Sequence, residues 1–171
     1  GYLMEEVGFE LTRVAYDMEH SLEIELPFLQ RALSKPFRLV PVMVREPGEV
    51  VARGLGKALA RMISGLQGET GILVASTDLS HFYAEAQAKQ LDGEMLRQIA
   101  AFDPAGVIRT EEEGKGFACG SGALAAVLWA ARQLGAEEVQ VLQHATSGDV
   151  TGDYERVVGY GAAVVTRKTG V

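Results

Sequence analysis

The chain has 171 residues, enough for one domain with a buried core, and 47% of them are apolar, as in typical globular proteins. The net charge of −7 argues against non-specific binding to nucleic acid or acidic membranes, since phosphate binding requires clustered lysines and arginines. No apolar segment is long enough to span a bilayer, the first residues lack the features of a signal peptide, and one cysteine excludes an internal disulfide framework. We therefore expect a single cytoplasmic domain over residues 1–171, with no membrane or nucleic-acid partner.

The first half of the chain predicts two helices and two strands. Residues 21–33 and 50–66 carry apolar residues at helical spacing, and Pro27 marks a kink or a first turn in the earlier helix. The Val-rich run 37–44 predicts a short buried strand, and the proline within it favours a sheet edge or a strand end. Residues 71–75 give the strongest strand prediction, since they are apolar throughout, as in a strand covered on both faces.

The second half continues the alternation of helices and strands, which predicts an α/β fold. The expected elements are helices at 84–101, from Pro104 onward and at 123–134, and strands at 138–145 and 157–166. Gly159 and Gly161 in the last strand predict a bulge or a close backbone approach.

A polar run, Ser-Thr-Asp-Leu-Ser-His, follows the strand predicted at 71–75 and ends at His81. Functional groups in open α/β sheets collect at the carboxyl ends of strands, so His81 is a candidate catalytic residue or metal ligand. Asp78 could orient its imidazole ring. The alternative is that Asp78 only caps the helix that follows.

Cys119 lies in a glycine-rich turn, residues 114–122, just before a predicted helix. Exposed amides and the positive end of a helix favour a thiolate, which could bind a metal or act as a nucleophile. The alternative is a small buried apolar residue, as most free cysteines are. The positions of the other two histidines indicate a functional role less clearly. His20 sits beside Glu19 at a helix entrance, where a cap or a surface pair is the simpler interpretation, and His144 follows a predicted strand.

Four stretches resemble signatures of the MEMO family. Residues 19–29 resemble its Glu-His-Ser segment followed by a Leu-Pro-aromatic pattern, and residues 76–82 resemble its Ser-Ser/Thr-Asp-x-x-His-aromatic motif. The pair at residues 119–120 matches the family's Cys-Gly in position and order, and residues 160–163 resemble its last strand. The resemblance covers essentially the whole chain.

The resemblance implies an αβα sandwich similar to class III extradiol dioxygenases, in which histidine and carboxylate side chains hold a non-haem iron. The family's pocket residues correspond here to His81 and Cys119, with Asp78, Glu19 and His20 nearby, and the implied metal is iron or copper. In bacteria and archaea such proteins resemble component B of the AmmeMemoRadiSam system, which implies radical-SAM and AMMECR-like partners.

The family pattern also includes a Pro-His-Ala-Gly-Tyr-like motif with a further pocket histidine, which this sequence lacks. We therefore expect a partial domain without the N-terminal portion, an incomplete metal site, and a homo-oligomer that covers exposed sheet edges and apolar surface. Three functions remain open. They are a metal-pocket protein acting beside radical-SAM and AMMECR-like proteins, a metal-dependent dioxygenase-like redox enzyme, and a Cys–His hydrolase or non-catalytic binding module.

Overall fold

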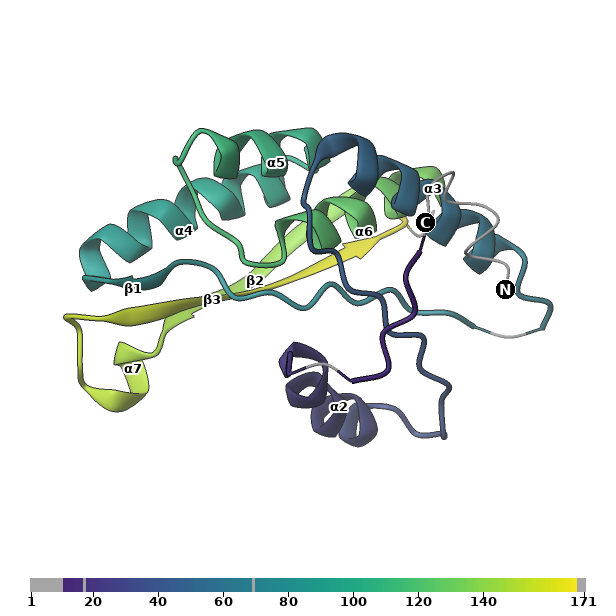
Figure 1. The fold of residues 1–171 in the computed structure, drawn as a ribbon, viewed down its shortest axis with the longest axis horizontal. Helices are drawn as coiled ribbons and strands as arrows, with labels where there is room; N and C mark the ends of the chain where they lie inside the picture. The colour runs from purple at the N-terminus through teal and green to yellow at the C-terminus, as the bar shows by residue number, and fades with distance from the viewer. Residues whose placement is uncertain (1–10, 17, 69, 169–171) are drawn as a thin grey trace.

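The computed structural model describes residues 11–16, 18–68 and 70–168 (Figure 1). These residues form six helices and three strands. The helices are α2 (Ser21–Ala32), α3 (Glu49–Ser64), α4 (Glu85–Ala100), α5 (Pro104–Glu112), α6 (Ser121–Gln133) and α7 (Gly148–Thr151), and the strands are β1 (His81–Tyr83), β2 (Glu138–Thr146) and β3 (Val157–Thr166). No helix in this described part is long and apolar enough to cross a membrane.

The three strands form one antiparallel sheet in the order β1-β3-β2. The register of β2 and β3 runs from Glu138 opposite Thr166 to Thr146 opposite Gly159. The register shifts between Val141 and Gln143, so the irregularity lies on β2 and not at the glycines of β3. The glycines of β3 instead allow neighbouring side chains to approach the backbone of the strand closely. A close backbone approach was the second of the two possibilities predicted for them.

The core lies between the sheet and a layer of helices. Helix α4 packs on β2 and β3, α5 packs on α4 and α6, and α3 packs along α6. Close contact of α3 and α6 depends on Gly56, where a Cβ atom would lie 2.6 Å from the Cβ of Trp129. Leu79, Met95 and Leu128 are among the largest fully buried side chains, so the core is built from the segment before β1 as well as from helices.

The helices are distributed unevenly about the sheet. In Figure 1, α4, α5 and α6 lie above the strands, whereas α2 and α7 lie below them. On β3, alternate residues Tyr160 and Val164 are 44% and 40% exposed, and Leu142 at the irregularity of β2 is 52% exposed. We call the face that carries Tyr160 and Val164 the open face of the sheet, because the layer formed by α4, α5 and α6 leaves these apolar side chains exposed.

Two predicted strands are wrong in the described part of the chain. Residues 37–44 and 71–75 have no strand assignment there, although the latter alternates like a strand: Leu73 packs against the core while Ile72 is 62% exposed. A strand requires a hydrogen-bonded neighbour, and neither segment pairs with β1, β2 or β3. The sheet that is present is small and antiparallel, and its short strand β1 falls where a polar loop was expected.

Candidate metal site

Two chain segments far apart in sequence are joined by reciprocal hydrogen bonds between Asp78 and Cys119. The amide of Cys119 donates to the carbonyl of Asp78 at 3.2 Å, and the amide of Asp78 donates to the sulfur of Cys119, also at 3.2 Å. The amide of Gly120 donates to Oγ1 of Thr77 at 2.8 Å, and that hydroxyl donates to the carbonyl of Asp78. The polar run before β1 and the turn before α6 therefore form one rigid unit.

This unit brings three metal-ligating side chains together. Asp78, His81 and Cys119 each offer one ligand atom, and these atoms all lie within 4.8 Å of one another. Nε2 of His81 lies 3.6 Å from Oδ2 of Asp78. Asp78 and His81 are half-buried and Cys119 is exposed, so the cluster sits at the surface and is accessible from solvent.

The imidazole of His81 is held by ring contacts and not by hydrogen bonds to Nε2. The rings of Phe82 and Phe117 lie 5.8 Å and 5.4 Å from it, centroid to centroid. Its Nε2 atom is buried and makes no hydrogen bond to any described residue. A buried polar nitrogen without a partner costs free energy, and a metal ion bound by this nitrogen would remove that cost. The donor set of carboxylate, imidazole and thiolate therefore fits a transition metal.

Tyr160 is a neighbour of this cluster that the sequence did not reveal. His81 pairs with Val158 across β1 and β3, and Val158 and Tyr160 lie two residues apart, on the same face of β3. Burial raises the pKa of the Tyr160 phenol, and the negative charge of Asp78 raises it further. The phenol thus remains a hydrogen-bond donor beside the cluster. The alternation of side chains between the two faces of β3 was the sequence signal that could have placed Tyr160 on the same face as the cluster.

The N-terminal motif is anchored next to the cluster without adding a ligand to it. The hydroxyl of Ser76 donates to the carbonyl of Ser21 at 3.1 Å and lies 3.3 Å from Oε1 of Glu25, which holds α2 beside the polar run. Glu19 accepts hydrogen bonds from the amides of His20 and Ser21. These amides lie at the start of α2, whose N-cap residue, His20, makes no side-chain capping hydrogen bond. That Glu19 and His20 line a pocket stays a prediction.

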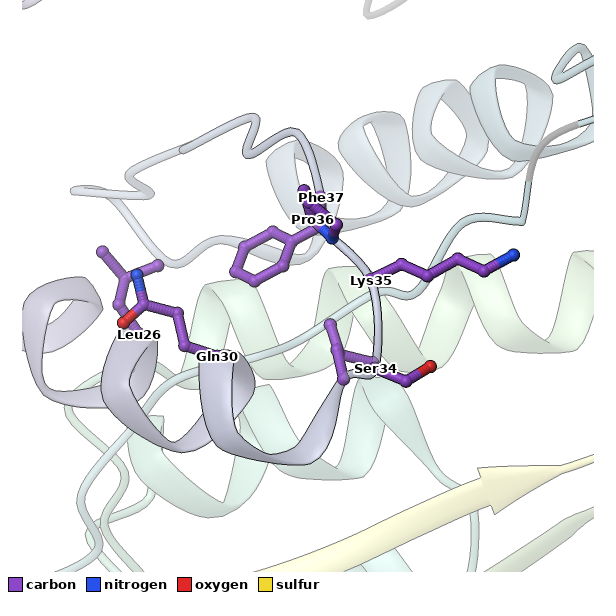
Figure 2. A pocket seen from close by; sticks show the side chains of 7 residues that line it. Leu26, Gln30, Ser34, Lys35, Pro36 and Phe37 are labelled. Carbon is purple, nitrogen blue, oxygen red and sulfur yellow. The ribbon is translucent and has the colours of Figure 1, made fainter.

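His20 forms a surface contact. Its Nδ1 atom lies 3.7 Å from Oε1 of Glu23, and both side chains are largely exposed. A separate pocket lies at the carboxyl end of the same helix (Figure 2), and no histidine, cysteine or acidic residue lines it. Its lining residues are Leu26, Gln30, Leu33, Ser34, Lys35, Pro36 and Phe37. Among the described residues, the three-ligand cluster is therefore the best candidate for chemistry.

His144 belongs to a different arrangement. Its Nε2 atom lies 2.8 Å from Oδ2 of Asp92, a residue of α4 that is fully buried. Its partner across the sheet is Gly161, one residue from Tyr160, so His144 faces α4 and the metal-ligating cluster lies toward the other face. The structure thus separates His81, the first residue of β1, from His144, which lies within β2 and not after it.

Comparison with known proteins identifies the family. A model described as Memo-like protein matches residues 3–164. A MEMO1 family protein of Methanopyrus kandleri is 40% identical over 153 residues, which cover 90% of this chain and 54% of the relative. Another MEMO1 family protein, of Methanosarcina mazei, is 35% identical over 152 residues, which cover 89% of this chain and 57% of the relative.

A third MEMO1 family protein, from Methanococcoides burtonii, is 34% identical over 165 residues, which cover 96% of this chain and 62% of the relative. The chain thus spans little more than half the length of the curated relatives that it matches. The extent of the family match and the level of identity agree with the motifs at residues 19–29 and 76–82. The chain belongs to the Memo-like (MEMO1) protein family.

Proposed function

We propose that this chain binds a transition metal through the carboxylate of Asp78, Nε2 of His81 and the sulfur of Cys119. The observation that carries the proposal is the meeting of these three donors within 4.8 Å around a buried imidazole nitrogen that lacks a hydrogen-bond partner among the described residues. Ligands of one tetrahedral ion with bonds of ~2.0–2.3 Å lie about 3.3–3.8 Å apart. The 3.6 Å between Asp78 and His81 already falls in that range.

The donor set fits iron, copper or zinc, and the family resemblance favours iron or copper as the metal. Imidazole suits both ions, thiolate favours cuprous copper and iron, and a carboxylate favours ferrous iron. Three protein ligands leave at least one position open for a substrate or a further ligand. A bound redox metal would supply electron transfer or activation of a small molecule at that position.

The residues around the cluster prepare it for this role. The amide of Asp78 donates to the sulfur of Cys119, and α6 begins at Ser121, two residues after that cysteine. The phenol of Tyr160 stays protonated and supplies a hydrogen-bond donor at the open face. The chain therefore offers a carboxylate, an imidazole and a sulfur as ligands, with a neutral donor beside them.

The alternative functions differ in what they require of His81. A dioxygenase-like redox enzyme needs an accessible metal with open positions, and the exposure of Cys119 favours it as the second candidate. A Cys–His hydrolase needs the imidazole to take a proton from the thiol, but Nε2 of His81 makes no hydrogen bond to any described residue. A non-catalytic binding module would use the same surface without turnover.

Two further parts of the proposal rest on family membership. We propose radical-SAM and AMMECR-like proteins as partners, which co-purification of the chain with each purified candidate would test. We also propose that the sheet belongs to an αβα sandwich similar to class III extradiol dioxygenases. Helices on one face and exposed apolar residues on the open face support this architecture.

Metal analysis tests the central proposal. The purified chain is incubated anaerobically with ferrous iron, cuprous copper or zinc, beside Asp78→Ala, His81→Ala and Cys119→Ala. Glu112→Ala is the control, because this exposed carboxylate lies outside the cluster. We expect near-stoichiometric metal in the wild type and the control, and loss in the three variants. Equal metal in His81→Ala and the wild type would overturn the proposal.

A further inference from the structure

A buried carboxylate lies behind the candidate metal site and contacts none of its ligand side chains. Asp92 on α4 has 0% exposure. Its Oδ1 atom accepts a hydrogen bond from the amide of Ser80 at 2.9 Å, and its Oδ2 atom lies 2.8 Å from Nε2 of His144. A Cβ atom on Gly159 would lie 2.0 Å from Oδ2, so β3 leaves space for the carboxylate only because this residue is glycine. Asp92 thus ties α4 to β2 and to the polar run before β1.

The Ser80 amide is the contact that links Asp92 to the site. Ser80 directly precedes His81 and follows Asp78 by two residues, so fixing its peptide restricts both ligands. The same stretch is hydrogen bonded to β3, since the amide of Leu79 donates to the carbonyl of Gly159 at 2.9 Å and the amide of Gly159 donates to the carbonyl of Ser80 at 2.8 Å. Asp92 holds the same stretch by a hydrogen bond from the side of α4.

A buried carboxylate needs hydrogen-bond partners to offset its lost hydration. The Ser80 amide and the His144 imidazole supply one partner for each oxygen of Asp92. An apolar residue would fill the same volume without requiring such partners. The use of a carboxylate at this point is therefore explained by the peptide that it holds, and not by packing.

We propose that Asp92, supported by His144, is a positioning residue of the candidate metal site: it fixes the Ser80 peptide and thereby the separation of the Asp78 and His81 ligand atoms. The metal readout below rests on the proposed function, whereas the metal-free readout does not. Partners that orient metal ligands typically change metal affinity ~10–100-fold when removed. Asp92→Ala should show a loss of that size.

The experiment compares four full-chain variants with the wild type. Asp92→Ala removes the acceptor of the Ser80 amide, whereas Asp92→Asn keeps an oxygen acceptor for it and offers an amide donor to His144. His144→Gln keeps a donor for Asp92. Ile99→Ala, on the same helix and 5% exposed, is the control for general destabilisation. Nuclear magnetic resonance of the metal-free protein follows Ser80 amide exchange and the His81 ring signals, and cobalt(II) titration follows affinity and the thiolate-to-cobalt absorption band.

We expect Asp92→Ala to speed Ser80 exchange, shift the His81 signals, lower cobalt affinity ~10–100-fold and alter the absorption band. Asp92→Asn and His144→Gln should remain near the wild type, and Ile99→Ala should change stability but not the band. Unchanged Ser80 and His81 signals in Asp92→Ala, or the same changes in Ile99→Ala, would overturn the positioning role. If the wild type takes up no cobalt while Asp92→Ala still displaces Ser80 and His81, the metal function fails and the positioning role stands.

Discussion

At the scale of single residues, the contact between Asp92 and Gly159 shows how tightly the region behind the site is packed. The carboxylate occupies the volume that a side chain on Gly159 would need. The two residues lie on α4 and β3, so one added methyl group would displace the carboxylate from its position between the helix and the strand. Gly93, next to Asp92 on α4, gives the opposite situation, because a Cβ atom added there would meet nothing within 4 Å.

These two glycines give a paired prediction. Gly159→Ala should lower the free energy of unfolding by about 1–3 kcal/mol, because the carboxylate must shift from its partners. Gly93→Ala should raise it by about 0.5–1 kcal/mol, since alanine favours an exposed helix interior. Urea unfolding of both variants measures the difference. Equal stability of the two would show that Asp92 can move aside without cost.

Glu111 gives a pH-dependent prediction at the same scale. Burial raises the pKa of its carboxyl above 4.5, and the neighbouring Ser121 hydroxyl lowers it to a smaller extent. Well below pH 4.5 the carboxyl is protonated in both the folded and the unfolded state, so its ionisation does not affect the free energy of unfolding. As the pH rises past 4.5 the unfolded state ionises first, so stability falls until the pH exceeds the folded pKa.

Glu111→Gln removes the loss of stability that follows ionisation of this carboxyl. The variant should therefore be more stable than the wild type at neutral pH and equally stable at low pH. Urea unfolding across the pH range checks the convergence. Glu112→Gln is the matched control, because this neighbour is exposed, and it should follow the wild type within about 0.5 kcal/mol. A constant offset at every pH would assign the effect of Glu111→Gln to packing instead of ionisation.

Sequence reasoning at this scale singled out the candidate cluster, with His81 and Cys119 as expected ligands and Asp78 as an orienting residue, but it did not single out the residues around that cluster. Asp78, His81 and Cys119 stand out because their residue types and their places at strand and helix ends point to chemistry. Asp92 and Tyr160 do not, because one lies in the middle of an amphipathic helix and the other in an apolar strand. Their significance arises from contacts between segments that only the folded chain brings together.

At the scale of elements, α2 packs loosely against the part of the molecule that the structure describes. None of its side chains is buried against the described residues, and Ile24 and Phe28 are 66% and 71% exposed. Pro27 lies inside the helix, where it removes a backbone hydrogen bond. The Ser76 hydroxyl holds its first turn. Helix α2 should therefore unfold locally without global unfolding.

Pro27→Ala tests this independence. An interior proline costs a helix ~3 kcal/mol, so amide hydrogen exchange within α2 should slow markedly in the variant. The urea midpoint of the whole chain should stay unchanged, because α2 contributes little buried surface. By contrast, Pro104→Ala should lower the midpoint, since that ring is buried at the first turn of α5. A higher midpoint for Pro27→Ala would mean that α2 unfolds with the core.

The helices were predicted closely and the strands less well, for a physical reason. Helical hydrogen bonds are local, so residues 84–101 and 123–134 could be assigned from spacing alone and agree with α4 and α6 within two residues at each end. Strand assignment depends on a neighbour that sequence spacing does not supply. Residues 71–75 have the composition of a buried strand, yet they pair with no strand in the described part of the chain.

At the scale of the whole molecule, the open face of the sheet is the dominant feature. The α/β class and the family were predicted from the sequence, but the antiparallel order of the strands was not. Tyr160 and Val164 are partly exposed on this face, and Leu142 adds apolar surface at the irregularity of β2. Exposed apolar surface next to a sheet edge promotes association.

The predicted homo-oligomer can be tested on this face. The chain should elute above its monomer mass of 18.3 kDa in size-exclusion chromatography at micromolar concentration, and Val164→Lys should shift it toward the monomer. Val50→Lys, at an 84% exposed valine of α3, is the control and should leave the elution unchanged. A monomeric wild type would contradict the prediction.

The reciprocal bonds between Asp78 and Cys119 also set the order of events during biosynthesis. The two residues are 41 apart in sequence, so a ribosome adding ~5–20 residues per second needs about 2–8 s to make the second after the first. The strand β3, which pairs with β1, is made later still. A nascent chain therefore has no assembled cluster until α4 and α5 have been synthesised, so a metal that requires all three side chains binds only after that point.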